Sequence, residues 1–223
     1  MKLSILMPVF NEAPTISLIV DRVQAVPLDK EIVLVNDASS DGSDKILDRL
    51  AGPGVKVIHH PSNHGKGAAI RTGMESATGE VIVIQDADLE YNPNDFLRLI
   101  QPIVEGKADV VYGVRALDSQ RPIMRLGNHF LTVVTNALYG GPLADMETCY
   151  KMMRREIALS LDLECRRFDV EAEISAKLLR AKHKIFELPI EYTARYENKK
   201  LSPSDGFPAL RALWKYRNWQ PKK

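Results

Sequence analysis

Short, continuous apolar runs alternate with amphipathic segments through the first half of the chain. Continuous runs are typical of strands covered on both faces, and helical segments between them predict parallel strands joined by crossovers. The expected strands lie at residues 3–10, 31–37, 55–60, 80–86 and 108–114. The expected helices begin at Glu12, Ser43 and Lys66, and after Asn92. The pattern therefore predicts an α/β fold with a mostly parallel sheet and helices on both faces.

The pattern changes after residue 114. A polar loop leads to residues 123–139, where apolar positions recur at helical spacing. The elements expected beyond it are an apolar strand with Met152 and Met153, a helix near residues 169–182, a strand at 183–192 and a last helix from Phe207. We find no internal repeat, and we expect a single domain over residues 1–223.

Charge and cysteine content narrow the classes of function. The net charge of +1 gives no overall preference for nucleic acid, so no nucleic-acid partner is expected. Cys149 and Cys165 form neither a metal-binding spacing nor a disulfide framework, as in proteins of a reducing cytosol, although one bridge between them stays open. The most apolar window, residues 130–138, is much shorter than the roughly 18 apolar residues of a membrane span. We do not expect the chain to cross a bilayer by itself.

Three acids follow the apolar run in the stretch VIVIQDADLEYNP. Asp86 and Asp88 are two residues apart, so an extended chain points both carboxylates to one side of the sheet edge. Ligands of open α/β sheets bind beyond the carboxyl ends of the strands, and carboxylates there suit Mg²⁺ or Mn²⁺. Together with Glu90 they predict a metal site. The alternative is a solvated turn whose acids cap the helix starting near Asn92.

Polar side chains also follow the first two expected strands. Phe10 and Glu12 come after the first, and Asn36, Asp37 and Asp41 come after the second. Because the carboxyl ends of parallel strands meet at one edge, these clusters together indicate a binding cleft.

The stretch NHGKGAAIRTG places Lys66 between two glycines at a helix start. It lacks the P-loop pattern, because Gly67 stands where Ser or Thr is needed and the first glycine that the motif requires before Lys66 is absent. The backbone N–H groups of Gly65 and Gly67, helped by Lys66, can still bind an anion. The alternative is a glycine-rich helix entry with a solvated lysine.

Five blocks together resemble a known family. PVFNE, VNDASSDGS, GKGAAIRTG, GEVIVIQDADLEYNP and YGVR have the order and spacing of family 2 glycosyltransferases with the GT-A fold. LADMETCYKMMRRE and ELPIEYTAR look most like the branch of dolichyl-phosphate and polyprenyl-phosphate mannose or glucose synthases. The resemblance reaches about residue 201. It implies a Rossmann-like sheet with a nucleotide-sugar-binding half at 1–115, an acceptor-side half at 116–205 and a basic amphipathic helix at 206–223.

The resemblance implies residues for the donor. The base and ribose of a sugar nucleotide would be held by Pro8, Phe10, Glu12, Val35 and Asp37. The metal, Mg²⁺ or Mn²⁺, would be bound by Asp86 and Asp88, with Glu90 where relatives often have Gln.

The resemblance also implies residues for the phosphates and the acceptor. Donor and acceptor phosphates would be surrounded by Arg115, Arg125, Arg195 and Lys200. Asp145 matches an aspartate on the acceptor side, and the residues expected in catalysis are Asp88, Arg115, Arg125 and Asp145. The alternative for Arg115 and Arg125 is that they are loop arginines, paired with Asp118 or with nothing.

The resulting expectation is a metal-dependent, inverting glycosyltransferase. It would move mannose or glucose from a GDP- or UDP-sugar to a dolichyl or undecaprenyl phosphate. A lipid phosphate is ionised at neutral pH and needs no general base, whereas a sugar hydroxyl does. One alternative is therefore a soluble hydroxyl acceptor with Asp145 as the base. Another is a catalytically silent subunit that binds a sugar nucleotide within a membrane complex.

The tail at residues 207–223 combines aromatic and basic side chains, which fits an anionic membrane surface. The apolar stripe at residues 130–138 is a second candidate for membrane contact. The alternative is that Leu210, Leu213 and Trp214 pack on the domain and leave the cations to water. We expect a peripheral protein at the cytoplasmic face of a membrane, with a possible integral-membrane partner.

Overall fold

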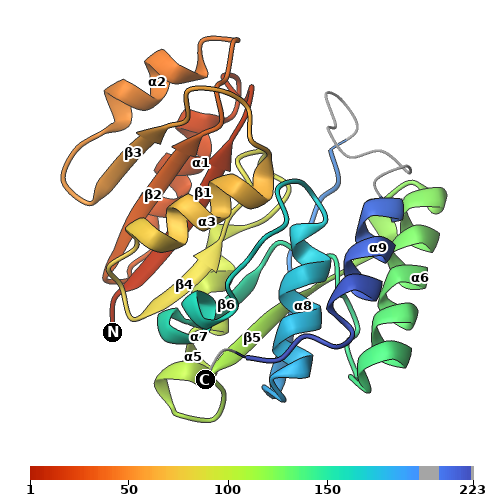
Figure 1. The fold of residues 1–223 in the computed structure, drawn as a ribbon. Helices are drawn as coiled ribbons and strands as arrows, with labels where there is room; N and C mark the ends of the chain where they lie inside the picture. The colour runs from red at the N-terminus through yellow and green to blue at the C-terminus, as the bar shows by residue number, and fades with distance from the viewer. Residues whose placement is uncertain (196–205, 222–223) are drawn as a thin grey trace.

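A seven-stranded sheet forms the centre of the computed structural model, which describes residues 1–195 and 206–221 (Figure 1). The strands are β1 Leu3–Val9, β2 Lys30–Asn36, β3 Val55–His59, β4 Val81–Ile84, β5 Val110–Arg115, β6 Lys151–Arg154 and β7 Ile185–Ile190. Their order across the sheet is β3-β2-β1-β4-β6-β5-β7, and β6 runs antiparallel to both of its neighbours. The predicted mostly parallel sheet is confirmed. The antiparallel direction of the strand that carries Met152 and Met153 was not predicted.

Helices cover both faces of this sheet, with α1 behind the strands and α3 in front of them in Figure 1. The α-helices are α1 Ile16–Ala25, α2 Ser43–Leu50, α3 Lys66–Ser76, α4 Phe96–Leu99, α5 Gln101–Val104, α6 Pro122–Tyr139, α7 Arg155–Ser160, α8 Val170–Arg180 and α9 Gly206–Tyr216. Short 3-10 helices lie at η1 Pro93–Asp95 and η2 Leu117–Ser119. All the helices that the sequence predicts are present. The helix α7 is present as well, although it was not predicted.

The first helix begins at Ile16 and not at Glu12. Asn11 has a φ of 52°, which is outside the helical region, and the N–H of Thr15 donates to the carbonyl of Glu12 at 3.0 Å in a turn. The short helix after β4 starts as predicted, because the side chain of Asn92 accepts a hydrogen bond from the N–H of Asn94.

The order of the strands places a ligand site beside β1. The chain runs outward from β1 through β2 to β3, and then returns to the other side of β1 with β4. Such a switch point leaves a crevice at the carboxyl ends of the strands. The residues after β1, β2 and β4 therefore share one edge, as the sequence predicts.

The helix α9 packs on α8 over a buried ion pair that lies within α8. Lys177 Nζ lies 2.6 Å from Glu173 Oε1, and both side chains are fully buried. The same ammonium group lies over the rings of Tyr216 and Trp219, 4.5 and 5.4 Å from their centroids. These contacts fix α9 beside α6 and α8 in one helical layer (Figure 1).

The structure also bears on the packing of the last helix and on the state of the two cysteines. Leu213 is fully buried, as packing of the last helix on the domain requires, whereas Trp214 is 60% exposed. Cys149 and Cys165 are both free and buried, so no bridge joins them. Within residues 1–195 and 206–221, no helix combines the length and the apolar character that a bilayer span requires.

The entry to α3 packs directly on the segment before α8. The carbonyl of Arg166 accepts a hydrogen bond from the N–H of Ala68 at 3.3 Å. A Cβ atom built on Gly65 would overlap the carbonyl oxygen of Arg166, and one built on Gly67 would overlap that of Cys165. Glycine is needed at both positions because backbone passes against backbone there.

We therefore expect Gly67→Ala to lower the melting temperature. Overpacking of this kind costs about 1–3 kcal/mol, which corresponds to roughly 2–4 °C per kcal/mol for a chain of this size. Gly127→Ala is the matched control, because Gly127 is also helical but has open space around its Cα. That variant should melt at the wild-type temperature or above it. Equal melting temperatures for both variants in calorimetry would contradict the close approach.

Candidate active site

A cavity of about 560 Å³ opens at the carboxyl edge of β1, β2 and β4. It brings together most of the residues that the sequence singled out, namely Pro8, Phe10, Glu12, Asp37, Lys66, Asp86, Asp88, Glu90, Arg115 and Arg195. They come from six separate regions of the chain. The clusters after the separate strands thus form one site.

Four predicted site residues are not placed in this cavity. Val35 is buried in β2. Arg125 is half exposed on α6, with Nη1 3.8 Å from Asp118 Oδ1, as in the alternative of a surface pair. Arg125 and Asp145 instead line a second cavity of about 440 Å³ along α6. Lys200 lies outside the described residues.

Glu12 joins the start of the chain to the segment after β7. Its two carboxylate oxygens accept hydrogen bonds from both terminal nitrogens of Arg195, each at 2.8 Å. The N–H of Glu12 donates to Ser43 Oγ at 3.0 Å, at the start of α2. Hydrogen bonding to Glu12 raises the pKa of Arg195. This paired fork closes one wall of the cavity.

Asp37 fixes the turn that leads into α3. Its carboxylate accepts hydrogen bonds from the N–H groups of His64 and Gly65 at 2.8 and 2.7 Å, and Oδ1 lies 2.8 Å from His60 Nδ1. Gly65 has a φ of 92°, in the left-handed region that glycine adopts without strain. Asp37 therefore holds the backbone of the glycine turn at the cavity edge.

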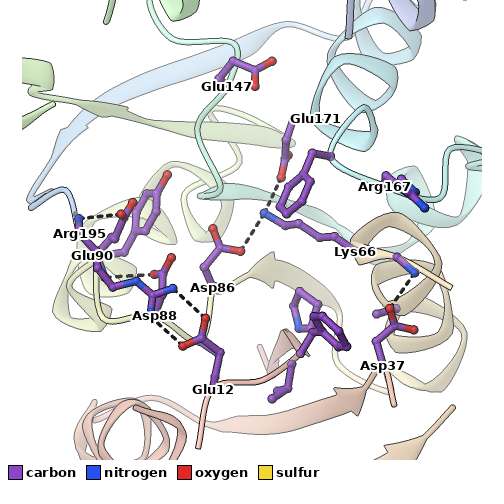
Figure 2. A pocket seen from close by; sticks show the side chains of 18 of the residues that line it. Glu12, Asp37, Lys66, Asp86, Asp88, Glu90, Glu147, Arg167, Glu171 and Arg195 are labelled. Atoms are coloured by element: carbon purple, nitrogen blue, oxygen red, sulfur yellow. Dashed lines mark hydrogen bonds and ion pairs between the residues drawn. The ribbon is translucent and has the colours of Figure 1, made fainter. Parts of the chain in front are cut away.

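Lys66 bridges two carboxylates at the centre of the cavity (Figure 2). Its Nζ lies 2.8 Å from Asp86 Oδ1 and 2.9 Å from Glu171 Oε1. Burial alone would lower the pKa of Lys66, but Asp86 and Glu171 hold it well above its ordinary value. In this structure, the positive charge of the lysine is therefore shared between the carboxylates of Asp86 and Glu171.

The acids after β4 have different environments. Burial, followed by the charges of Asp86 and Glu90, raises the pKa of Asp88 to about 7. Glu90 is buried and accepts hydrogen bonds from the hydroxyl of Tyr192 at 2.8 Å and the N–H of Arg195 at 2.7 Å. The burial of Glu90 disagrees with the alternative in which these acids lie in a solvated turn. Asp88 is the acid of this group that most needs a cation.

The three acids do not converge on one metal position. In the part of the chain that the structure describes, no group of three or more His, Cys, Asp or Glu side chains is arranged to hold a metal ion. The reason is that Asp86 faces Lys66 and Glu90 faces Tyr192 and Arg195. Asp88 still fits a divalent cation, because Mg²⁺ commonly takes one or two carboxylates and completes its shell with substrate phosphate and water.

Arg115 and Asp145 form a buried, two-point ion pair. Arg115 donates through Nε and Nη2 to the two carboxylate oxygens at 2.7 and 2.8 Å, and its own N–H donates to Oδ2 at 3.2 Å. Burial acts to raise the pKa of Asp145, but Arg115 outweighs it and the pKa is lowered. A carboxylate held in this way accepts protons poorly. Its geometry fits the positioning of Arg115, whose guanidinium carbon lies 5.2 Å from the centre of the Tyr192 ring.

The cavity contains acids that sequence reasoning did not select. Glu171 comes from the buried face of α8, where a charged residue breaks the apolar pattern. Glu147 lies in the quoted stretch LADMETCYKMMRRE, but an isolated acid in a loop carries no signal of its own. Burial raises the pKa of Glu147 to about 7, with Lys151 opposing the rise. Among cations, Arg167 was also missed.

Carboxylates outnumber cations around this cavity. Among the residues that the structure describes, seven carboxyl side chains line it, against the four cationic side chains of Lys66, Arg115, Arg167 and Arg195. Three of these four cations are paired with carboxylates: Lys66 with Asp86, Arg115 with Asp145, and Arg195 with Glu12. An anionic ligand therefore meets a negative site unless a cation enters with it.

We expect the acidity of Asp88 to limit stability at high pH. Its folded-state pKa is above its ordinary value, so the stability is present below pH 4 and is lost as the pH rises through about 7. Asp88→Asn removes this loss. This variant should melt above the wild type, and the gain in melting temperature should be about 3 °C or more larger at pH 8 than at pH 5. The reason is that each pKa unit is worth about 1.4 kcal/mol.

The matched control for this prediction is Asp21→Asn, at an exposed site on α1. It should shift the melting temperature equally at both pH values. The same difference between Asp88→Asn and wild type at pH 5 and pH 8 in calorimetry would contradict the raised pKa.

Comparisons with known proteins agree with this arrangement. Residues 4–161 match the family model described as Glycosyl transferase family 2. Undecaprenyl-phosphate 4-deoxy-4-formamido-L-arabinose transferase of Pseudomonas fluorescens (strain Pf0-1) is 31% identical over 209 residues, which cover 90% of this chain and 60% of that protein. The protein of the same name from Pectobacterium carotovorum subsp. carotovorum (strain PC1) is 30% identical over 169 residues, which cover 73% and 51%. The chain thus spans between half and two thirds of the length of these relatives.

Solved structures show the same fold. The glucosyl-3-phosphoglycerate synthase of M. tuberculosis superposes with a TM-score of 0.79 at 17% identity, over 99% of this chain and 82% of that one. Its complex with Mn²⁺, UDP-glucose and phosphoglyceric acid superposes with a TM-score of 0.78 at 17% identity, over 99% and 81%. The expected GT-A fold is confirmed.

Proposed function

Because the chain belongs to glycosyl transferase family 2, we propose that it moves a sugar from a nucleoside diphosphate to a polyprenyl phosphate with the help of a divalent cation. One observation carries the proposal. Asp88 is held with a raised pKa in a cavity where carboxylates outnumber cations. A diphosphate that enters together with Mg²⁺ or Mn²⁺ supplies the missing positive charge. The names of the relatives support undecaprenyl phosphate as the acceptor.

The chain's own residues would orient the donor. Phe10 and Asp37 line the end of the cavity that follows β1 and β2, where we place the nucleoside. Asp88 would hold the divalent cation that binds the diphosphate. That cation would act as a Lewis acid on the leaving group. Arg115 uses Nε and Nη2 on Asp145 and keeps Nη1 for a ligand phosphate.

The transfer itself needs no proton acceptor. An oxygen of the lipid phosphate forms a bond to the anomeric carbon, and the bond from that carbon to the diphosphate breaks with its electron pair on the diphosphate. Inversion at carbon follows from this single displacement. The paired state of Asp145 counts against the alternative in which it deprotonates a hydroxyl acceptor.

The identity of the sugar is a separate proposal. The relatives are named for a formamido-arabinose, and their names do not support the expected mannose or glucose. A solved neighbour contains UDP-glucose, which supports a uridine nucleotide as the first candidate. We propose a UDP-linked pyranose and would test hexoses together with 4-amino-4-deoxypentoses.

We expect turnover to require both the cation and the lipid phosphate. Release of nucleoside diphosphate can be followed with a panel of UDP- and GDP-sugars, Mn²⁺ or Mg²⁺, and a short polyprenyl phosphate in detergent. Asp88→Asn should lower kcat/KM by about 100-fold or more, as losses of a key electrostatic group do, and Asp21→Asn should not. A rate of donor cleavage that is the same with and without the lipid phosphate would contradict polyprenyl phosphate as the acceptor. Nucleotide binding without turnover of any donor would favour the silent-subunit alternative.

The outer face of α6 is our candidate for membrane contact. Four apolar side chains at helical spacing are between 49% and 64% exposed there, namely Ile123, Leu126, Phe130 and Val133. Phe207 on the adjacent α9 is 76% exposed. The second cavity lies along the same helix and shares Asn128 with the main cavity. A lipid phosphate could thus reach the donor from this face. The cytoplasmic side and an integral-membrane partner stay predictions.

We expect Leu126→Glu combined with Phe130→Glu to weaken binding to phosphatidylglycerol vesicles in a sedimentation assay. Two charges on the contact face would have to be desolvated when the protein binds the membrane. Each apolar side chain that no longer enters the bilayer also costs about 1.5–3 kcal/mol of binding energy. Leu18→Glu is the matched control, since Leu18 is 45% exposed on α1 behind the sheet. The same vesicle affinity for the α6 variant and the wild type would remove this face from the proposal.

A further inference from the structure

Glu147 is a partly buried acid in the wall of the main cavity, and one of its carboxylate oxygens has no partner among the described residues. It lies in the loop between α6 and β6, and it lines the cavity. Its Oε1 is buried and has no hydrogen-bond partner among the described residues. A buried polar oxygen left without a donor costs about 1–3 kcal/mol, so such an atom in a ligand cavity indicates a partner on the ligand.

The cations around Glu147 are committed elsewhere. Lys151 Nζ donates to the carbonyls of Met146 and Thr148 and to Glu171 Oε2 at 3.1 Å. Arg115 donates to both oxygens of Asp145. The two cations whose charges act on Glu147 thus donate their hydrogen bonds to other groups.

The position of Glu147 selects one part of the substrate. In Figure 2, Glu147 and Glu171 lie on one side of Asp86, and Glu12 and Asp37 lie on the other. With the nucleoside beside Asp37 and the diphosphate at Asp88, the sugar extends toward Glu147. This step rests on the proposed function.

The charge of Glu147 selects the kind of group. A carboxylate repels the phosphate of the acceptor and the diphosphate of the donor, but it accepts hydrogen bonds from neutral O–H and N–H groups. We propose that Glu147 accepts a hydrogen bond from a hydroxyl or amide N–H of the donor sugar, and that it thereby selects which sugar is transferred. A sugar that lacks the donor group leaves the carboxylate unsatisfied and is rejected.

The test compares free nucleotide with sugar nucleotide. Isothermal titration with Mn²⁺ would measure the affinities of UDP and GDP and of their sugar conjugates for the wild type, Glu147→Ala and Glu147→Gln. For the sugar that the wild type prefers, Glu147→Ala should lose about 10- to 100-fold in affinity, as for a hydrogen bond to a charged group. The affinity for the free nucleotide should stay within about 2-fold. Glu147→Gln, which keeps an acceptor oxygen, should lose less.

Glu156→Ala is the matched control, because Glu156 is an exposed acid on α7. It should leave every affinity unchanged. A second readout keeps the test independent of activity: Glu147→Gln should raise the melting temperature of the free protein at pH 8, because it removes a buried charge.

Several outcomes would overturn the inference. They are equal losses for UDP and UDP-sugar, unchanged affinities for all ligands, or a loss of kcat with unchanged sugar affinity, which would make Glu147 a base. The two proposals fail differently. A wild-type protein that binds no nucleotide overturns the proposed function and this inference with it, whereas nucleotide binding with unaltered sugar preference overturns this inference alone.

Discussion

Carboxylates crowd the carboxyl edge of this sheet, and the rest of the structure depends on how they are neutralised. Glu12 is held by Arg195 from the far end of the chain, and Lys66 bridges Asp86 and Glu171. A buried carboxylate that loses its cation is strongly destabilising, so these pairs hold the ends of β1 and β4, the entry to α3 and the segment after β7 in one arrangement. Sheet, helical layer and cavity are therefore joined by charge as well as by apolar packing.

Among the described residues, the same pairs leave the cavity with little spare positive charge. Arg115 is bound to Asp145, and Asp88 has no cation of comparable strength beside it. This is why we propose that a negatively charged donor binds together with a divalent cation. The cavity is thus suited to a diphosphate that arrives as a metal complex, and its remaining unsatisfied acid, Glu147, is suited to a neutral part of the same ligand.

Most of the fold could be predicted from the sequence, because continuous apolar runs and helical spacing are local signals. The polar residues at the ends of β1, β2 and β4 could be predicted to meet, because the carboxyl ends of parallel strands lie at one edge of the sheet. The ion pair between Glu12 and Arg195 could not, since 183 positions separate the two residues and no local pattern links them. Glu147 was missed because a loop has no periodicity. Val35 was expected at the ligand, but it is buried within β2.

We propose that a divalent cation makes nucleotide binding possible in this negative cavity. The most direct test is the affinity of the wild-type protein for UDP and GDP, measured by isothermal titration with increasing Mn²⁺ and in the presence of EDTA. The account predicts that affinity rises with Mn²⁺, that it is lost in EDTA, and that Asp88→Asn removes the dependence. Nucleotide binding of the same strength in EDTA and in Mn²⁺ would contradict it.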